Sequence, residues 1–175
     1  MSNLNPNYRQ ASTFAELGLC KPLLQTCSAL GFRLPTAVQS AVIPAVLSPK
    51  RRHVLALSSI GLGNTAAFAL PMLHTLILDP YGIYGVVLTL TRELAKQIVE
   101  QITALGSSLR VRAVLVVGGD DSVRQYCDLA RLPHFVAATP GRLASLLRGI
   151  AKIHLTSRVE VGAGTVGQFT TNYLA

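Results

Sequence analysis

Short apolar runs alternate with longer segments of helical periodicity along most of this chain. The runs are rich in Val and Leu, which is typical of strands covered on both faces. They lie at residues 53–57, 85–90, 111–117 and 134–138. Helices are predicted at residues 19–30, 36–47, 65–78, 91–105, 122–130 and 141–147. Repeated strand–helix units indicate an α/β fold, a parallel sheet with helices on both faces.

The pattern changes after Gly149. Residues 156–175 are rich in Gly, Thr and Val and show no sustained period. We therefore expect a flexible N-terminus over residues 1–13, a folded domain over residues 14–149, and a divergent, disordered tail over residues 150–175. Four strands would leave an unpaired sheet edge, a known association hazard, unless the tail covers it.

Composition adds one constraint on partners. Half of the 175 residues are apolar, which allows one domain with a real core. The 16 Lys and Arg residues against 8 Asp and Glu residues give a net charge of +8. Such a charge favours a polyanion such as RNA. A basic surface without any ligand is the alternative that charge alone leaves open.

The cysteines and the N-terminus point to an intracellular protein. The first thirteen residues contain no apolar stretch, so no secretory signal is predicted. No apolar run reaches the roughly 20 residues that span a bilayer. Cys20 and Cys27 would lie roughly 10 Å apart along one helix, beyond the roughly 7 Å limit for a disulfide. With Cys127, we expect three reduced cysteines, no disulfide partner and no membrane segment.

The loop at residues 58–65 carries the first candidate chemistry. Its sequence, Ser-Ser-Ile-Gly-Leu-Gly-Asn-Thr, joins a strand to a helix. In a phosphate-binding loop, glycines let backbone N–H groups close around a phosphate, a lysine reaches the terminal phosphates and a hydroxyl holds Mg²⁺. Here Asn64 stands in place of the lysine, and Thr65 would hold the metal. Alone, the two glycines favour an ordinary tight turn.

Further segments change that interpretation. Phe14 precedes Gly31-Phe32-Arg33-Leu34-Pro35-Thr36-Ala37-Val38-Gln39, and Leu90-Thr91-Arg92-Glu93-Leu94-Ala95, Gly118-Gly119 and Thr139-Pro140-Gly141-Arg142 follow. Their order and spacing resemble the Q motif, motif Ia, glycine doublet and motif Ib of the DEAD-box ATP-dependent RNA helicases, most closely the ribosome-assembly branch. The resemblance covers residues 14–149 and implies an incomplete RecA-like (P-loop NTPase) domain. It implies RNA and ribosome-assembly proteins as partners, in the nucleus, nucleolus or cytoplasm.

The resemblance implies a site for ATP or ADP with Mg²⁺. The Gln39 amide offers a donor and an acceptor that suit an adenine edge, and Phe14 or Phe32 would stack on the ring. The alternatives are a core aromatic for Phe32 and a solvent-exposed amide for Gln39. The implied nucleotide set is Phe14, Phe32, Gln39, Ser59, Gly61, Leu62, Gly63, Asn64 and Thr65, with Thr65 as metal ligand.

The resemblance also implies an RNA-backbone track. Thr91 and Arg92 follow a strand and open a helix, where N–H groups, hydroxyl and guanidinium can converge on a phosphate. The alternative is helix capping by Thr91 and Thr139 with solvated arginines. Two such strand ends close together would form one track, made of Thr91, Arg92, Gly118, Gly119, Thr139, Pro140, Gly141 and Arg142.

Several departures from the family pattern bear on catalysis. Asn64 weakens triphosphate binding by about ten- to hundredfold, since a charged hydrogen bond contributes roughly 1.5–3 kcal/mol. Ile60 and Leu62 replace small or polar residues, and Leu90 replaces a proline. No Asp-Glu-Ala-Asp segment exists, and Asp120-Asp121 is typical of a turn or helix cap.

We therefore expect a domain that is truncated before the Asp-Glu-Ala-Asp motif and the second RecA-like domain, with no catalytic residue of its own. The family activity, ATP-dependent RNA unwinding, would be impaired. The alternatives are a fragment of a longer working helicase, a non-catalytic interaction module or competitor of a full-length helicase, and a non-functional truncated copy.

Overall fold

The computed structural model describes residues 10–49, 53–59, 61–78, 80, 82–148, 159–163 and 168–173, the last two ranges by their backbone alone. The described chain begins four residues before the predicted domain boundary. Gln10 donates its Nε2 to the carbonyl of Pro35 at 3.0 Å, and the Ala11 N–H donates to the Ser40 hydroxyl at 3.3 Å. Residues 1–9 of the predicted flexible N-terminus lie outside the described residues.

The described elements up to residue 148 alternate as the apolar pattern predicts, and the four predicted strands and six predicted helices begin and end close to their predicted boundaries. The elements are η1 (Ala15–Leu17), α1 (Lys21–Ala29), α2 (Ala37–Leu47), β1 (Val54–Leu57), α3 (Asn64–Leu78), β2 (Gly85–Thr89), α4 (Arg92–Leu105), η2 (Ser107–Leu109), β3 (Ala113–Val116), α5 (Ser122–Ala130), β4 (Phe135–Ala138), α6 (Pro140–Arg148), β5 (Val159–Ala163) and β6 (Gln168–Tyr173).

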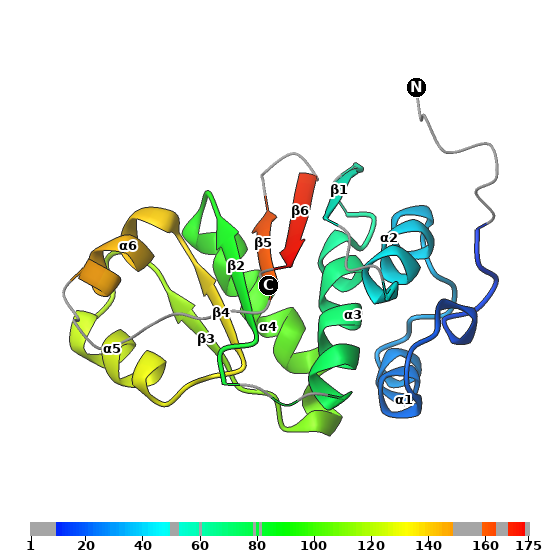
Figure 1. Cartoon of the computed structure of the whole chain (residues 1–175), viewed down its shortest axis with the longest axis horizontal. Coiled ribbons are helices and arrows are strands. Elements are labelled where there is room, and N and C mark those ends of the chain that lie inside the picture. Colours follow the sequence, from blue (N-terminus) through cyan, green and yellow to red (C-terminus); the bar gives the residue numbers. More distant parts are fainter. Residues whose placement is uncertain are drawn as a thin grey trace.

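These strands form one sheet in the order β1-β6-β5-β2-β4-β3 (Figure 1). The strands β2, β3, β4 and β5 pair in parallel, whereas β6 runs antiparallel to both of its neighbours. Because parallel neighbours need crossovers, the helices fall on the two faces of the sheet. The predicted α/β class is confirmed, with β6 as the antiparallel exception.

The tail differs from its prediction. Residues 159–163 and 168–173 form β5 and β6, so the expectation of a disordered tail is wrong for these two ranges. The remaining tail residues lie outside the described residues. Two valines in β5, and Phe, Tyr and two threonines in β6, favour β structure, and the free edges of β1 and β2 supply partners.

The two tail strands lie inside the sheet and leave its outer edge open. Gly85 pairs in register with Val159, and Val54 with Thr171. The outer strand β1 carries Leu55 and Leu57, which are 66% and 65% exposed. The tail therefore pairs the inner edges of β1 and β2, and β1 remains an apolar edge strand.

The apolar core is divided by the sheet. On one side, α2, α3 and α4 pack around buried residues such as Phe68, Leu73 and Ile98. On the other side, α5 and α6 cover β2, β3 and β4 through Leu129, Leu143 and Leu146. Figure 1 shows α5 and α6 apart from α1, α2 and α3, with the strands between them. None of the described helices is long and apolar enough to cross a membrane.

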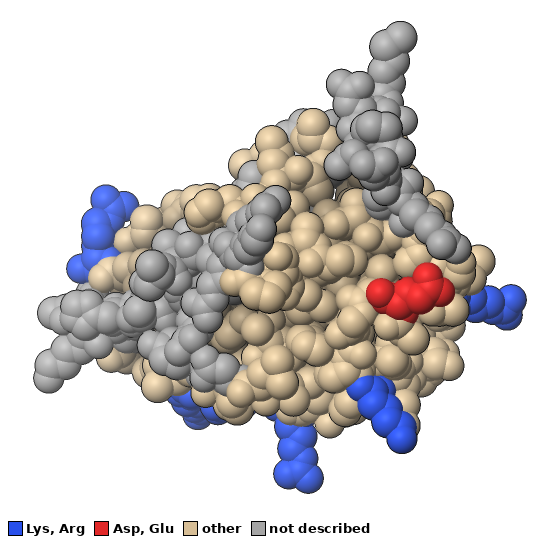
Figure 2. All heavy atoms as spheres, turned by 45° about the vertical axis from the view of Figure 1, so that its right-hand side comes forward, with Lys and Arg blue, Asp and Glu red and all other residues tan. Residues whose placement is uncertain are grey.

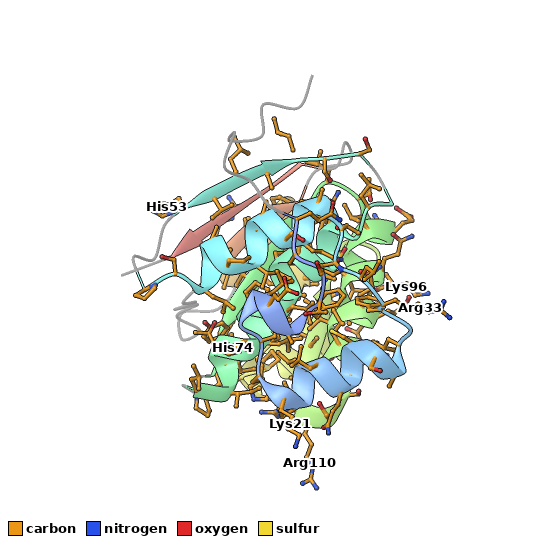
Figure 3. All side chains as sticks on the ribbon, turned by 90° about the vertical axis from the view of Figure 1, so that its right-hand side faces the viewer. Lys21, Arg33, His53, His74, Lys96 and Arg110 are labelled. Atoms are coloured by element: carbon orange, nitrogen blue, oxygen red, sulfur yellow. The ribbon has the colours of Figure 1, made fainter. Side chains whose placement is uncertain are left out.

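The positive charge of the described residues is spread out. Figure 2 shows Lys and Arg side chains placed separately around one face, with little acid among them. Figure 3 likewise shows Lys21 and Arg110 at one end of this side and Arg33 and Lys96 at its edge. Net charge therefore does not by itself locate a binding surface on these faces.

Candidate functional site

The loop between β1 and α3 has the backbone of a phosphate cradle. Gly61 and Gly63 adopt left-handed conformations, with φ of +83° and +79°. A side chain at Gly63 would also collide with the Gln39 amide, so conformation and space both require glycine there. The helix α3 begins directly at Asn64, and its first N–H groups face this loop. Ile60 lies outside the described residues.

The Asn64 side chain closes this loop on itself. Its Oδ1 accepts a hydrogen bond from the Ser58 hydroxyl, and its Nδ2 donates to the carbonyl of Ser59 at 3.4 Å. The Ser58 hydroxyl also lies 3.3 Å from that carbonyl. The residue that replaces the phosphate-binding lysine thus binds its own loop, and it brings no charge for a phosphate.

Gln39 is buried, with only 3% of its surface exposed. Its Oε1 accepts from the Thr36 N–H at 3.0 Å, and its Nε2 donates to the Gly63 carbonyl at 3.2 Å. The Thr36 hydroxyl in turn donates to the Leu62 carbonyl at 2.8 Å. The alternative of a solvent-exposed amide is wrong. Contact between Gln39 and an adenine stays a prediction; each end of the amide keeps one further donor or acceptor position beyond these bonds.

The two aromatic candidates contact each other. The rings of Phe14 and Phe32 are tilted by 32°, with centroids 6.0 Å apart. Phe14 belongs to the buried core, and the half-buried Phe32 packs against it. The core role predicted as the alternative for Phe32 is thus also the role of Phe14. Stacking of either ring on a base stays a prediction.

The role of Thr65 as a Mg²⁺ ligand stays a prediction. Thr65 stands in the first turn of α3. Among the described residues, no group of three or more His, Cys, Asp or Glu side chains could hold a metal ion. Asp121 caps α5 instead, accepting from the N–H groups of Val123 at 2.8 Å and Arg124 at 3.5 Å, so its predicted role as a helix cap is confirmed.

A second candidate site lies at the carboxyl ends of β2, β3 and β4. An open groove of about 810 Å³ collects residues from the loops that follow these strands. The groove contains every residue predicted for the RNA track except Gly119. Its lining is Leu90, Thr91, Arg92, Glu93, Gly118, Thr139, Pro140, Gly141, Arg142 and Ser145. The predicted convergence of the two strand ends is therefore present.

Thr91 also has the capping role that was considered as the alternative. Its side chain accepts from the Leu94 N–H at 3.2 Å and so begins α4. Thr139 uses its backbone: its carbonyl accepts from the N–H groups of Arg142 and Leu143, both at 3.1 Å. Leu90, which replaces a proline, is 71% exposed along this groove. Capping by Thr91 is compatible with a contact to a bound phosphate.

The glycine doublet makes room for Arg92. A Cβ on Gly119 would lie 2.5 Å from Arg92 Nη1, and a Cβ on Gly118 would lie 3.4 Å from Arg92 Nη2. The guanidinium therefore rests against the backbone of the doublet. In the structure the doublet seats an arginine that lines the groove, and Gly118 lines the groove as well; direct contact of the doublet with RNA stays a prediction.

Arg142 is held by three neutral acceptors. Its Nε donates to Gln125 Oε1, and its Nη2 donates to the Asp120 carbonyl and the Ser122 hydroxyl, each at 2.9 Å. Gln125 is a residue that the sequence analysis missed. The sequence does contain an indication of its role: Gln125 is a polar residue four positions before Leu129, and so lies on the buried face of α5.

Comparisons with known proteins identify the family to which these loops belong. A family model described as DEAD/DEAH box helicase matches residues 36–161. The chain belongs to the DEAD/DEAH box helicase family. This helicase domain is 53% identical over 136 residues to the DEAD-box ATP-dependent RNA helicase 36 of Oryza sativa subsp. japonica, covering 78% of this chain and 27% of that protein.

Two further matches extend the finding. Over 133 residues, the helicase domain is 50% identical to the ATP-dependent RNA helicase DBP8 of Eremothecium gossypii, covering 76% of this chain and 30% of that protein. It resembles the structure of Mss116p bound to ssRNA and AMP-PNP, with a TM-score of 0.80 and 27% identity, over 90% of this chain and 34% of that one. The predicted family and incomplete RecA-like fold are confirmed, and the chain spans under a third of the two curated relatives.

Proposed function

We propose that this helicase domain binds the backbone of RNA in the groove at the ends of β2, β3 and β4, and that it binds an adenine nucleotide weakly without hydrolysing it. The observation that carries this proposal is the pair of arginines in one groove. Arg92 lies on the glycine doublet, and Arg142 is bonded only to neutral acceptors.

The electrostatics of the groove support an anionic ligand. The described residues contain a single ion pair, between Arg131 and Asp128, so neither groove arginine is paired with a carboxylate. Glu93 is the one acid in the lining, beside Arg92 in sequence. Two unpaired guanidiniums beside helix starts offer charge and N–H donors to adjacent phosphates. The Mss116p structure, which contains ssRNA, supports RNA as that anion.

The nucleotide half of the proposal follows from the β1–α3 loop. Its backbone geometry is kept, and its charged side chain is replaced by an amide that closes the loop. We infer that ADP or ATP binds about ten- to hundredfold more weakly than it would with a lysine at position 64. No cluster of three or more His, Cys, Asp or Glu side chains that could hold a metal ion occurs among the described residues, and the loop lacks its lysine, so we infer that hydrolysis is impaired as well.

The relatives suggest a setting for this activity. Similarity to a relative named ATP-dependent RNA helicase DBP8 supports RNA as the ligand, and we propose the setting that the sequence resemblance implies, with ribosome-assembly proteins as neighbours and a nuclear or nucleolar location. A domain that holds RNA without spending ATP would act as a non-catalytic module or as a competitor of a complete helicase. The groove and the closed β1–α3 loop together favour such a non-catalytic role over active unwinding of RNA.

Fluorescence anisotropy of a labelled single-stranded RNA tests the proposal. We expect the 175-residue chain to bind the RNA, and Arg92→Ala/Arg142→Ala to weaken binding by more than tenfold. The matched control is Lys21→Ala/Arg33→Ala, which removes the same charge from exposed positions outside the groove (Figure 3). Equal losses in both double variants would mean that net charge, rather than the groove, binds RNA.

A further inference from the structure

The buried side chain of Gln125 joins two parts of the groove. Only 4% of Gln125 is exposed, although it carries a fully polar amide. Its Nε2 donates to the Val117 carbonyl at 2.9 Å, and its Oε1 accepts from Arg142 Nε at 2.9 Å. Both ends of the amide are therefore used, as a buried polar group requires. The first bond fixes the end of β3, and the second fixes a side chain of α6.

These bonds determine which edge of Arg142 is available. Nε and Nη2 are used by Gln125, Asp120 and Ser122, whereas Nη1 makes no hydrogen bond to the described residues. All three acceptors are neutral, so no carboxylate among the described residues offsets the positive charge of the guanidinium. A planar guanidinium that is already oriented loses less conformational entropy when it binds a phosphate.

The other bond of Gln125 lies beside the seat of Arg92. Val117 directly precedes Gly118 and Gly119, against which the Arg92 guanidinium rests. One buried amide thus ties the backbone that seats the first arginine to the side chain of the second. Arg142 Nη2 also donates directly to the carbonyl of Asp120, the residue after the doublet, and Gln125 adds to this link from the buried side.

We propose that Gln125 is a positioning residue of the RNA groove, which orients Arg142 with Nη1 free for a phosphate and keeps its charge unpaired. This inference rests on the proposed binding of RNA. The identity of the side chain matters. A methionine at position 125 has a side chain of similar length but would make neither hydrogen bond. A glutamate would keep the contact with Arg142 and would pair the positive charge of Arg142 with a carboxylate.

A double-mutant cycle on RNA affinity tests this role in the full chain. We expect Gln125→Met to weaken RNA binding by about tenfold in the wild-type background and by less than about twofold in the Arg142→Met background. Equal losses in both backgrounds would overturn the inference, because Gln125 would then act through general stability. Thermal melting of each variant accompanies the titrations.

The salt dependence of binding adds a readout that a structural role would not move. For single-stranded nucleic acid, each phosphate contact contributes about 0.7 to the slope of log affinity against log salt. We expect Gln125→Glu to lower the slope by about 0.7, as Arg142→Met does, and Gln125→Met to leave it unchanged. Because glutamate keeps the Arg142 contact, this variant still tests the inference if Gln125→Met does not fold; an unchanged slope would overturn it.

NMR of the RNA-free chain separates this inference from the proposed function. We expect the Arg142 Nε–H to exchange slowly with solvent in the wild type and at least about tenfold faster in Gln125→Met. If the wild-type chain does not bind RNA while this proton is protected, the proposed function fails and the positioning role fails with it. If RNA binds but the proton exchanges as fast as a solvated guanidinium, only the positioning role is overturned.

Discussion

Asn64 donates its side-chain Nδ2 to the carbonyl of Ser59, 3.4 Å away in the same loop. The lysine of a phosphate-binding loop would extend toward a nucleotide. The Asn64 amide instead bonds within its own loop, where it also accepts a hydrogen bond from the Ser58 hydroxyl. The backbone turn with Gly61 and Gly63 persists without a cation. The loop therefore keeps its phosphate-binding backbone but lacks the positive charge of the lysine. On this basis we treat nucleotide binding and hydrolysis as separate properties of this domain.

Restoring the lysine should restore nucleotide affinity. We expect Asn64→Lys to tighten the binding of a fluorescent ADP by about ten- to hundredfold, because a charged hydrogen bond to phosphate contributes roughly 1.5–3 kcal/mol. Asn64→Met, of similar length but uncharged, is the matched control and should give no gain. Equal affinities for all three chains would show that this loop does not bind the phosphates.

A side chain at the glycine doublet should displace Arg92. We expect Gly119→Ala to weaken RNA binding more than Gly118→Ala, because its Cβ would come within 2.5 Å of Arg92 Nη1, against 3.4 Å from Nη2 for Gly118. Anisotropy titrations compare the two variants. In an Arg92→Ala background the difference between them should shrink. Gly119 also has a φ of +91°, where a side chain strains the backbone, so a difference of the same size there would mean that this strain, rather than displacement of Arg92, causes the loss.

Two histidines should make the fold sensitive to acid. His74 Nδ1 accepts from the Cys20 N–H at 3.1 Å, beside the start of α1, where Figure 3 also places it, and His134 Nδ1 accepts from the Arg112 N–H at 3.0 Å. Burial lowers the pKa of His74 below 6.5, and burial together with the Arg112 charge lowers the pKa of His134 below 6.5.

Because the folded pKa values are lowered, the unfolded chain binds protons first as the pH falls through about 6.5. The stability is therefore full above that pH and declines below it. Urea unfolding at pH 7.5 and pH 5.5 should show this loss, and His74→Asn/His134→Asn should show a smaller one. A free energy of unfolding that is independent of pH in the wild type would contradict the two histidine contacts.

The cysteines report whether the domain folds at all. Cys127 is exposed, whereas Cys27 is 1% exposed in the core and burial raises its pKa to about 11. We expect a maleimide to label Cys127 quickly and Cys27 only after denaturation. Cys127→Ser should remove the fast phase. Rapid labelling of Cys27 in native buffer would instead support a truncated copy that lacks a stable core.

The elements that depend on local sequence were predictable. The boundaries of α3, α4 and α5 follow from apolar periodicity, and Asp121 caps α5 as its position before the helix suggests. The bonds of Gln39 were also readable in principle, since Thr36 and Gln39 have the spacing of a capping box. That signal competes with the adenine-binding interpretation for the same amide.

The rest depends on partners that are distant in sequence. The strands β5 and β6 form because β1 and β2 offer free edges, and short tails without periodicity do not reveal such pairing. Gln125 meets Arg142 across 17 positions, and Arg92 meets Gly119 only once the sheet places their loops together. The motif resemblance and the position of its residues at strand ends therefore predicted the groove, but not which groups hold its arginines.

One measurement tests the central claim most directly, namely that this domain holds RNA without spending ATP. A labelled single-stranded RNA is mixed with the full chain and Mg-ATP, and anisotropy and phosphate release are followed in the same sample. We expect the RNA to stay bound with no phosphate release above the protein-free rate. RNA-stimulated release of phosphate, or an RNA that remains free throughout, would contradict the account.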